Sequence, residues 1–355
     1  MQERNHISYI NQVETAVPEY EFHNQCIDFL QRFIDSPADL KKINEIIPNL
    51  GISYRYSVLE HLLANPKNST EEAFYQFDHL PSTAERMQLY KTHALTLVTQ
   101  VLEKLFLTQS PKDITHLLIS SCTGFYSPGI DIEITEKFHL DPGVERTIVG
   151  FMGCHAAINT LKLAKHISQA NDNAKILMVN IELSTLHFQN KFDINQLISN
   201  LIFADGCAAA IISREPYGIQ LESFSSTVIP GSMECMTWDI ADEGYAIYLD
   251  KSIPSFIKKH LPIFVDPIIN TKEIKYWSIH PGGRGILDLI QKTLVLTDME
   301  MSHSRKILRN YGNMSSATIM FILKEIMENE TEKGLGLACA FGPGLSIEAL
   351  VFRKE

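Results

Sequence analysis

The stretch from residue 147 to residue 164 constrains this chain more than any other. It opens with the apolar run Thr147-Ile-Val-Gly, passes through Gly153 and Cys154, and then repeats apolar residues at helical spacing. Because glycine tolerates backbone angles that other residues avoid, Gly153 permits a sharp turn before the helix. The pattern therefore predicts a buried strand, a tight turn and a helix, with Cys154 at or near the helix N-terminus.

The predicted position of Cys154 suggests a chemistry. Unpaired backbone amides and the helix dipole favour a thiolate at a helix N-terminus, and a thiolate is the nucleophile of covalent acyl transfer. The same residue is also compatible with a small, inert side chain in the core. Other residues of the sequence are needed to distinguish these two interpretations.

Strand and helix patterns alternate along most of the chain. The first half shows helical character at 20–65 around a loop at 51–56, an amphipathic helix at 84–107, a helix at 131–138, and strands at 114–121, 174–182 and 203–213. After the irregular segment 214–250, the second half shows strands at 274–280, 336–340 and 347–352, and helices at 286–296 and 317–327, with Ser315 or Ser316 as N-cap. We predict a mainly parallel α/β sheet covered on both faces, built from two similar halves, 1–213 and 214–355.

Composition removes several classes of function. The net charge of −11 argues against a nucleic-acid partner, although it allows a local basic pocket for an anion. The polar N-terminus has no apolar run behind it, and no stretch is long and apolar enough to span a membrane. The six cysteines form no C-x-x-C pair, so neither a zinc site nor a disulfide framework is expected. We expect a cytoplasmic protein with reduced thiols.

Three reactive side chains stand where a predicted strand gives way to a turn: Cys154, His280 and Asn313. Ligands of open α/β sheets bind at such strand ends. A histidine can activate a cysteine, and an asparagine amide can stabilise an oxyanion. Taken singly, His280 is also compatible with a structural histidine before a turn, and Asn313 with a helix cap. His155 is interpreted as structural, because adjacent helix residues do not face each other.

The order Cys, His, Asn also occurs in papain-like proteases, but the residues around Cys154 lack their C-G-[SA]-C-[WY] signature. Four motifs together resemble a type III polyketide synthase, the chalcone synthase-like branch of the thiolase superfamily. They are Gly153-Cys-His-Ala-Ala157, Trp277-Ser-Ile-His-Pro-Gly-Gly283, Tyr311-Gly-Asn-Met-Ser-Ser-Ala317 and Phe341-Gly-Pro-Gly344. The resemblance runs from about residue 5 to the end. It implies a thiolase-like fold, with two similar halves in a layered α/β/α/β/α core, and a homodimer.

The resemblance also implies roles for the three residues. Cys154 would take a starter acyl group from an acyl-CoA, and His280 would hold its thiolate as an ion pair. His280 and Asn313 would then donate hydrogen bonds to the thioester carbonyl of malonyl-CoA, stabilising the enolate formed when carbon dioxide leaves. By this resemblance the enzyme needs no metal or redox cofactor, and coenzyme A thioesters are its substrates.

Further residues match family positions that contact substrate. Phe203 matches an aromatic gatekeeper, although a core phenylalanine would also fit there. Ile247 stands at a second gatekeeper position that is usually aromatic, which favours an aliphatic starter. His187 stands where a small threonine is usual, and Ser315 matches a cavity serine. Gly342, Pro343 and Gly344 belong to the loop expected to shape the cavity floor.

The residues that hold coenzyme A are harder to assign. Lys42 and Arg55 are the candidates for gripping its phosphates, whereas Glu45 and Asn49 fall where basic residues are common. Ser127 matches a residue that reaches the partner's cavity in family dimers, where methionine is common. The charged residues are also compatible with a solvated surface that makes no contact with coenzyme A.

Three hypotheses remain. The first is a homodimeric type III polyketide synthase that condenses malonyl-CoA with an aliphatic acyl-CoA to give a pyrone, a resorcinol or a similar product. The second is a ketoacyl synthase III-like enzyme acting on an acyl carrier protein. The third is a catalytically silent thiolase-fold protein that only binds acyl thioesters.

Overall fold

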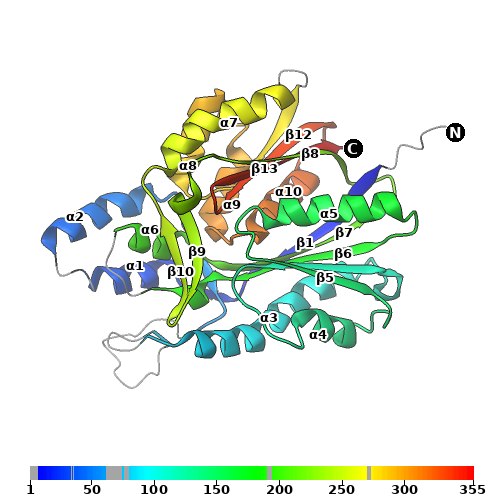
Figure 1. The fold of residues 1–355 in the computed structure, drawn as a ribbon, viewed down its shortest axis with the longest axis horizontal. Helices are drawn as coiled ribbons and strands as arrows, with labels where there is room; N and C mark the ends of the chain where they lie inside the picture. Colours follow the sequence, from blue (N-terminus) through cyan, green and yellow to red (C-terminus); the bar gives the residue numbers. More distant parts are fainter. Residues whose placement is uncertain are drawn as a thin grey trace.

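The computed structural model describes residues 7–355 except 33, 35, 61–73, 76–79, 190–193 and 270–272. Within them, nine strands join in one sheet in the order β11-β12-β13-β8-β1-β7-β6-β4-β5 (Figure 1). In that order the strands are Ile274–Ile279, Gly334–Gly342, Ser346–Lys354, Ile219–Val228, Ser8–Ala16, Asp205–Ser213, Ile176–Leu183, His116–Ser121 and Glu145–Gly150. The two halves of the chain meet at β1, which pairs with β7 on one side and β8 on the other.

The sheet is mixed, so the prediction of a mainly parallel sheet is wrong. Of the eight neighbouring pairs in this sheet, three are parallel: β11–β12, β4–β5 and β4–β6. The other five pairs are antiparallel. One reason is the short connection 343–345 between β12 and β13, because a connection of this length can join only antiparallel neighbours. Hydropathy patterns reveal buried strands but not their direction.

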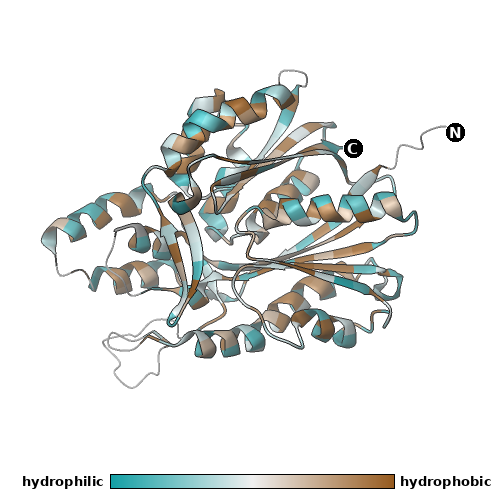
Figure 2. Cartoon of the chain, viewed as in Figure 1, coloured by the Kyte–Doolittle hydropathy of each residue, from teal (hydrophilic) through white to brown (hydrophobic). Residues whose placement is uncertain are grey.

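Helices form three layers around the strands. The central layer holds α5 (Ala156–Ala170) and α10 (Ala317–Asn329), between the strands of the two halves (Figure 1). One outer layer holds α3 (Thr83–Leu105) and α4 (Ile130–Lys137), and the other holds α7 (Ile253–Ile269), α8 (Arg284–Leu294) and α9 (Ser302–Tyr311). Buried apolar residues form three clusters that match these layers. The predicted layered α/β fold is therefore confirmed, and Figure 2 shows apolar colour along the strands between the helices.

The remaining elements gather at one end of the sheet, at the left of Figure 1. They are α1 (His23–Arg32), α2 (Pro37–Ile46), α6 (Ile194–Ile202), the hairpin of β9 (Met236–Ala241) and β10 (Gly244–Leu249), and the short pair β2 (Tyr20–Glu21) and β3 (Tyr56–Ser57). Short 3-10 helices span Ile47–Asn49, Pro111–Asp113, Ser184–His187 and Met233–Cys235. This end of the molecule carries the site described below.

One local prediction fails, and another is confirmed in position only. The run at Thr147 was expected to be buried, but β5 is an edge strand that pairs only with β4, and most of its residues are exposed. Ser316 does stand at the N-cap position of α10, yet its hydroxyl donates to the Glu182 carboxylate and makes no cap hydrogen bond. No helix among the described residues has the length and apolar character needed to cross a membrane.

Candidate active site

Cys154 lies in the turn between β5 and α5, as predicted. Gly153 adopts a positive φ of 83°, and α5 begins two residues after the cysteine, at Ala156. A Cβ atom at Gly153 would lie 2.3 Å from Cδ of Pro343, so the turn and the Phe341–Gly344 loop pack together only because residue 153 is a glycine. The Cys154 side chain stays partly exposed, so it is accessible to a ligand.

His280 follows directly after β11. Its backbone N–H donates to the carbonyl of Cys339 at 2.9 Å, which continues the pairing with β12 and fixes the end of the strand. The side chain is only 1% exposed, and neither ring nitrogen has a hydrogen-bond partner among the described residues. Buried polar groups are rarely left unpaired, so both ring nitrogens are available to a reacting group.

Asn313 is held by the backbone of the first half of the chain. Its N–H donates to the Ile202 carbonyl at 2.8 Å, and its carbonyl accepts from the Ala204 N–H at 2.9 Å. The side-chain oxygen Oδ1 accepts from the Ser315 N–H at 2.9 Å. Because Oδ1 is occupied, the amide NH₂ group is the part left to donate a hydrogen bond to a ligand.

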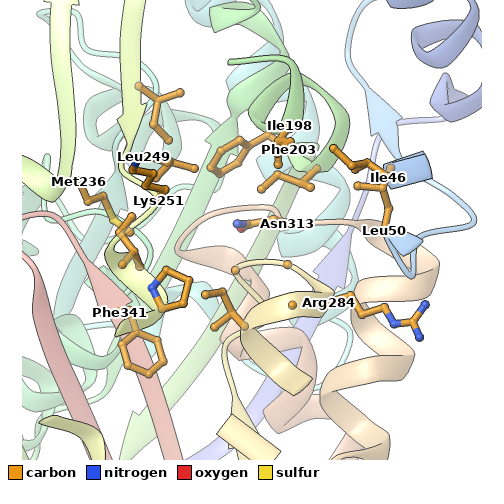
Figure 3. A pocket seen from close by; sticks show the side chains of 18 of the residues that line it. Ile46, Leu50, Ile198, Phe203, Met236, Leu249, Lys251, Arg284, Asn313 and Phe341 are labelled. Carbon is orange, nitrogen blue, oxygen red and sulfur yellow. The ribbon is translucent and has the colours of Figure 1, made fainter. Parts of the chain in front are cut away.

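Cys154, His280 and Asn313 all line one pocket with a volume of about 690 Å³, which we call the outer pocket. Its walls are mainly apolar, and Figure 3 shows Ile46 and Leu50 on one side of Asn313 and Met236 and Leu249 on the other. The charged residues on its lining are Lys42, Glu45, Asp250, Lys251 and Arg284. The three predicted catalytic residues therefore meet in one apolar pocket that also has cationic side chains.

Two much smaller cavities lie next to the outer pocket. One, of about 40 Å³, includes Cys154 in its lining, and the other is about 30 Å³. Phe203 and Ile247 line both of these inner cavities and also the outer pocket. These two predicted gatekeepers therefore stand at the boundary between one large space and two small ones.

Burial controls the charge of the catalytic pair. Loss of water raises the pKa of Cys154 to about 12; hydrogen bonds from Ser315 and Asn313 oppose this rise, and the charge of Glu182 adds to it. Burial, together with the charge of His155, lowers the pKa of His280 to about 3. Both shifts favour the neutral thiol and the neutral imidazole. The ion pair that the resemblance implies stays a prediction.

Glu182 is a buried acid that sequence reasoning missed. Its carboxylate accepts hydrogen bonds from the Cys122 N–H and the Thr123 hydroxyl, both at 3.0 Å, and from the Ser316 hydroxyl. Burial raises its pKa to about 7, against these hydrogen bonds, which lower it. The sequence did contain a signal for this residue, because Glu182 is the single acidic side chain in the apolar strand 176–183.

Arg55 is not a coenzyme A contact, so that prediction is wrong. Its side chain is fully buried: Nε donates to Nδ1 of His23 at 2.9 Å, and Nη1 donates to the carbonyls of Asn200 and Phe203 at 2.7 and 2.8 Å. The guanidinium also lies over the Phe22 ring. Arg55 therefore positions the Phe203 segment instead of facing solvent.

The other predicted contacts divide into two groups. Lys42 lines the outer pocket, with its ammonium 2.9 Å from Asp39, whereas Ser315 and Pro343 line an inner cavity. His187 lines the other inner cavity; its Nδ1 accepts from the Tyr245 N–H at 3.0 Å, so Nε2 is the nitrogen that donates to the Thr123 carbonyl at 2.7 Å.

The two loop glycines act through packing and turn geometry. A Cβ atom at Gly342 would lie 2.3 Å from the ring of His155, and Gly344 has a positive φ of 105°. Neither glycine is among the residues that line the three cavities. Their part is to shape the loop that presents Phe341 to the outer pocket and Pro343 to an inner cavity.

Comparison with known families agrees with this geometry. Residues 11–216 match the model of the N-terminal domain of chalcone and stilbene synthases, and residues 220–354 match the model of their C-terminal domain. The chain belongs to the chalcone and stilbene synthase family. It is thus a type III polyketide synthase, a class of acyltransferases that condense acyl-CoA substrates.

Several relatives support this assignment. The α-pyrone synthesis polyketide synthase-like protein Pks18 of Mycobacterium tuberculosis is 30% identical over 338 residues, covering 90% of this chain and 84% of that protein. PKS-I of the brown alga Ectocarpus siliculosus has a TM-score of 0.88 at 27% identity, with full coverage of both chains. The C-terminal type III domain of the Dictyostelium protein Steely1 has a TM-score of 0.89 at 26% identity, covering 98% of this chain and 99% of that one.

Proposed function

We propose that this enzyme loads an aliphatic acyl group from coenzyme A onto Cys154 and extends it with malonyl-CoA by decarboxylative condensation. The observation that carries the proposal is the meeting of Cys154, His280 and Asn313 in one apolar pocket. A nucleophile, a base with free ring nitrogens and an oriented amide donor are the groups that such a reaction uses. We propose that the product is a pyrone or a resorcinol.

In the loading step, the neutral imidazole of His280 takes the proton of the Cys154 thiol as its sulfur attacks the thioester carbonyl of the starter. The new bond joins this sulfur to the acyl carbon, and the bond to the coenzyme A sulfur breaks. The coenzyme A thiolate then takes the proton from His280. Burial lowers the pKa of His280, so the ring is neutral before each substrate arrives.

In the extension step, the malonyl thioester oxygen accepts hydrogen bonds from the Asn313 amide and from the N–H of neutral His280. The bond to the malonyl carboxylate breaks, carbon dioxide leaves, and the electron pair forms an enolate. The enolate carbon attacks the acyl carbon on Cys154, and the cysteine leaves as a thiolate. This route needs no metal or redox cofactor, because hydrogen-bond donors meet the charge on the enolate oxygen.

The walls of the outer pocket support an aliphatic starter. Leu50, Ile198 and Ile253 line it together with Ile247, and apolar walls favour an alkyl chain that has left water. Ile247 replaces a planar ring at the boundary with the inner cavities. The relative Pks18 is named for α-pyrone synthesis, and this supports a pyrone product for the present enzyme as well.

We assign the coenzyme A phosphates to the cationic side chains of the outer pocket. Lys42 and Lys251 belong to its lining, and Arg284 begins helix α8 directly after the turn that follows His280. The Arg284 Nη1 group lies 3.5 Å from Asn49 Oδ1, and in Figure 3 its guanidinium points away from the apolar side chains. The sequence could have indicated Arg284 as a phosphate contact, because this residue directly follows the Pro281-Gly-Gly turn.

We also propose that a second copy of the chain covers strand β5. This edge strand carries Ile148, which is 44% exposed, and nearby Met152 and Phe125 are 39% and 36% exposed. Edge strands with apolar side chains are open to pairing with another chain. Sedimentation should show a dimer that Ile148→Asp converts to monomer, whereas Val295→Asp, at an 87% exposed position directly after α8, leaves the dimer intact. A monomeric native protein would contradict this interface.

Incubation with malonyl-CoA and starters from acetyl-CoA to long-chain and aromatic acyl-CoA, followed by mass spectrometry, tests the activity. We expect polyketide products, preferentially from aliphatic starters, and their complete loss in Cys154→Ala. Cys235→Ala is the matched control, because Cys235 is also partly exposed but lies outside the three cavities. Condensation only with carrier-bound malonate would support the ketoacyl synthase alternative, and activity in Cys154→Ala would contradict the mechanism.

A further inference from the structure

His155, the residue after the nucleophile, is buried between helix α5 and the Phe341–Gly344 loop. It stands at the N-cap position of α5, yet its side chain makes no cap hydrogen bond and is only 3% exposed. Both ring nitrogens contact other side chains. Nδ1 lies 2.7 Å from Oδ1 of Asn159, and Nε2 lies 2.7 Å from Oγ of Ser346. A buried imidazole with a partner at each nitrogen is held in one orientation.

Ser346 extends this contact to the loop. Its hydroxyl donates to the carbonyl of Pro343 at 2.9 Å. Because a hydroxyl has a single proton to donate, the Ser346 oxygen accepts its other hydrogen bond from the Nε2–H of His155. A chain of two hydrogen bonds therefore joins the residue after Cys154 to Pro343, which lines an inner cavity together with Cys154.

Close packing joins the same two segments. A Cβ atom at Gly342 would lie 2.3 Å from the ring of His155, and a Cβ atom at Gly153 would lie 2.3 Å from Cδ of Pro343. The residues on both sides of Cys154 in the chain therefore pack against one loop. Because protein interiors are close-packed and transmit strain, a displacement of this loop is passed on to the turn that carries the thiol.

We propose that His155 is a positioning residue that fixes the Cys154 thiol relative to the other two residues of the mechanism. The inference rests on the proposed function. His155 lines neither the outer pocket nor an inner cavity, so it acts through the loop and not on the substrate. Without its N–H, Ser346 and Pro343 lose a fixed partner, the loop shifts, and the sulfur leaves the position from which it attacks. A displacement of about 1 Å can cost about 10²-fold in rate.

The test follows single-turnover transfer of a long-chain acyl group from coenzyme A to Cys154 by intact mass, over a series of acyl-CoA concentrations. His155→Phe keeps a ring but has no N–H, and we expect it to lower the maximal rate by about tenfold or more. The half-saturating concentration should stay within about twofold of the native value, because other segments supply most of the outer pocket. His155→Gln, whose amide can donate to Ser346, should recover most of the rate.

Ser346→Ala breaks the same chain of hydrogen bonds from its other side. It should lower the rate as much as His155→Phe does, and it decides the question if the phenylalanine variant does not fold. The double variant should be no slower than either single variant, because both changes remove one shared interaction. A double variant in which the two losses multiply would overturn the inference.

His166→Phe is the matched control and should keep the native rate, because His166 is exposed on the same helix and lines none of the three cavities. A purely structural role for His155 would lower the final extent of acylation and leave the rate in the acylated fraction unchanged. That result would overturn the inference, as would a native rate in His155→Phe. Absence of acylation in the native enzyme would instead contradict the proposed function, so the two failures are distinguishable.

Discussion

The outer pocket and the inner cavities differ in size, in lining and in what holds them together. The outer pocket is large and walled by aliphatic side chains, with Lys42, Lys251 and Arg284 among its charged residues. The inner cavities are small, and hydrogen-bonded groups such as His187 and Trp238 surround them. The catalytic cysteine lines both spaces. Cys154 thus stands between a large space with aliphatic walls and a small one bordered by hydrogen-bonded side chains.

The largest effect should come from Asn313, which lines the outer pocket beside Cys154 and His280 in the proposed mechanism. Asn313→Ala removes the amide that is oriented toward the substrate, and kcat for condensation should fall by about 10²–10³-fold, the usual effect of losing one oxyanion donor. Steady-state kinetics with malonyl-CoA measure this loss. Asn173→Ala, at an exposed position, should have no effect. A fall of less than about threefold in Asn313→Ala would remove Asn313 from the proposed mechanism.

The second effect is a change of stability with pH, and it concerns Glu182. Glu182 anchors the Cys122–Thr123 segment, and its pKa is raised from 4.5 to about 7. The folded state therefore binds the proton of Glu182 more tightly than the unfolded state, so the contribution of Glu182 to stability is greatest below its ordinary pKa and is lost as pH rises through about 7. The full difference is on the order of 3 kcal/mol.

Urea unfolding at about pH 5 and about pH 8 measures this effect. Between these two pH values the stability of Glu182→Gln should rise relative to that of the native protein, whereas Glu136→Gln, on an exposed part of α4, should follow the native protein. The same slope in Glu182→Gln and in the native protein would show that another group is responsible for the pH dependence.

The smallest effect should come from the outer pocket. Arg284→Ala should raise KM for malonyl-CoA by about fivefold and leave kcat nearly unchanged, because a partly exposed charge pair contributes roughly 1 kcal/mol. The increase should shrink at high salt. Lys292→Ala, in the last turn of the same helix, is the control. An unchanged KM would place the phosphates elsewhere on the surface.

Local signals in the sequence were sufficient to find the three residues that meet in the outer pocket. Gly153 before a helical pattern, and the turns after His280 and around Asn313, each mark a strand end, and the fold brings those ends to one pocket. The α/β class also followed from the alternation of patterns, whereas the layered core was implied by the family resemblance. Helix α3, for example, was predicted at 84–107 and spans Thr83–Leu105.

What sequence reasoning missed depends on contacts between distant segments. Helix α7 contains Pro262 and Pro267, which argue against a helix, yet buried residues at Ile253, Ile257, Leu261 and Val265 hold it against its neighbours. Strand β1, which has many polar residues, was missed, and its two partners lie beyond residue 200.

The substrate contacts were the least predictable part of the site. Arg55 has the charge expected of a phosphate ligand, but its burial depends on His23 and on the carbonyls of Asn200 and Phe203. Trp238 is one of only two tryptophans in the chain, and only the hairpin places it behind Cys154. Residue type indicates chemistry, whereas the tertiary fold decides which side chains face the ligand.

The most direct test of the account is the site of acylation. Native protein is incubated with a long-chain aliphatic acyl-CoA without malonyl-CoA, and its intact mass and peptide masses are measured. The account predicts one acyl group per chain, located on Cys154, with much slower acylation in His280→Ala. An acyl group on any of the other five cysteines, or no acylation while the native enzyme still forms product from the same starter, would contradict it.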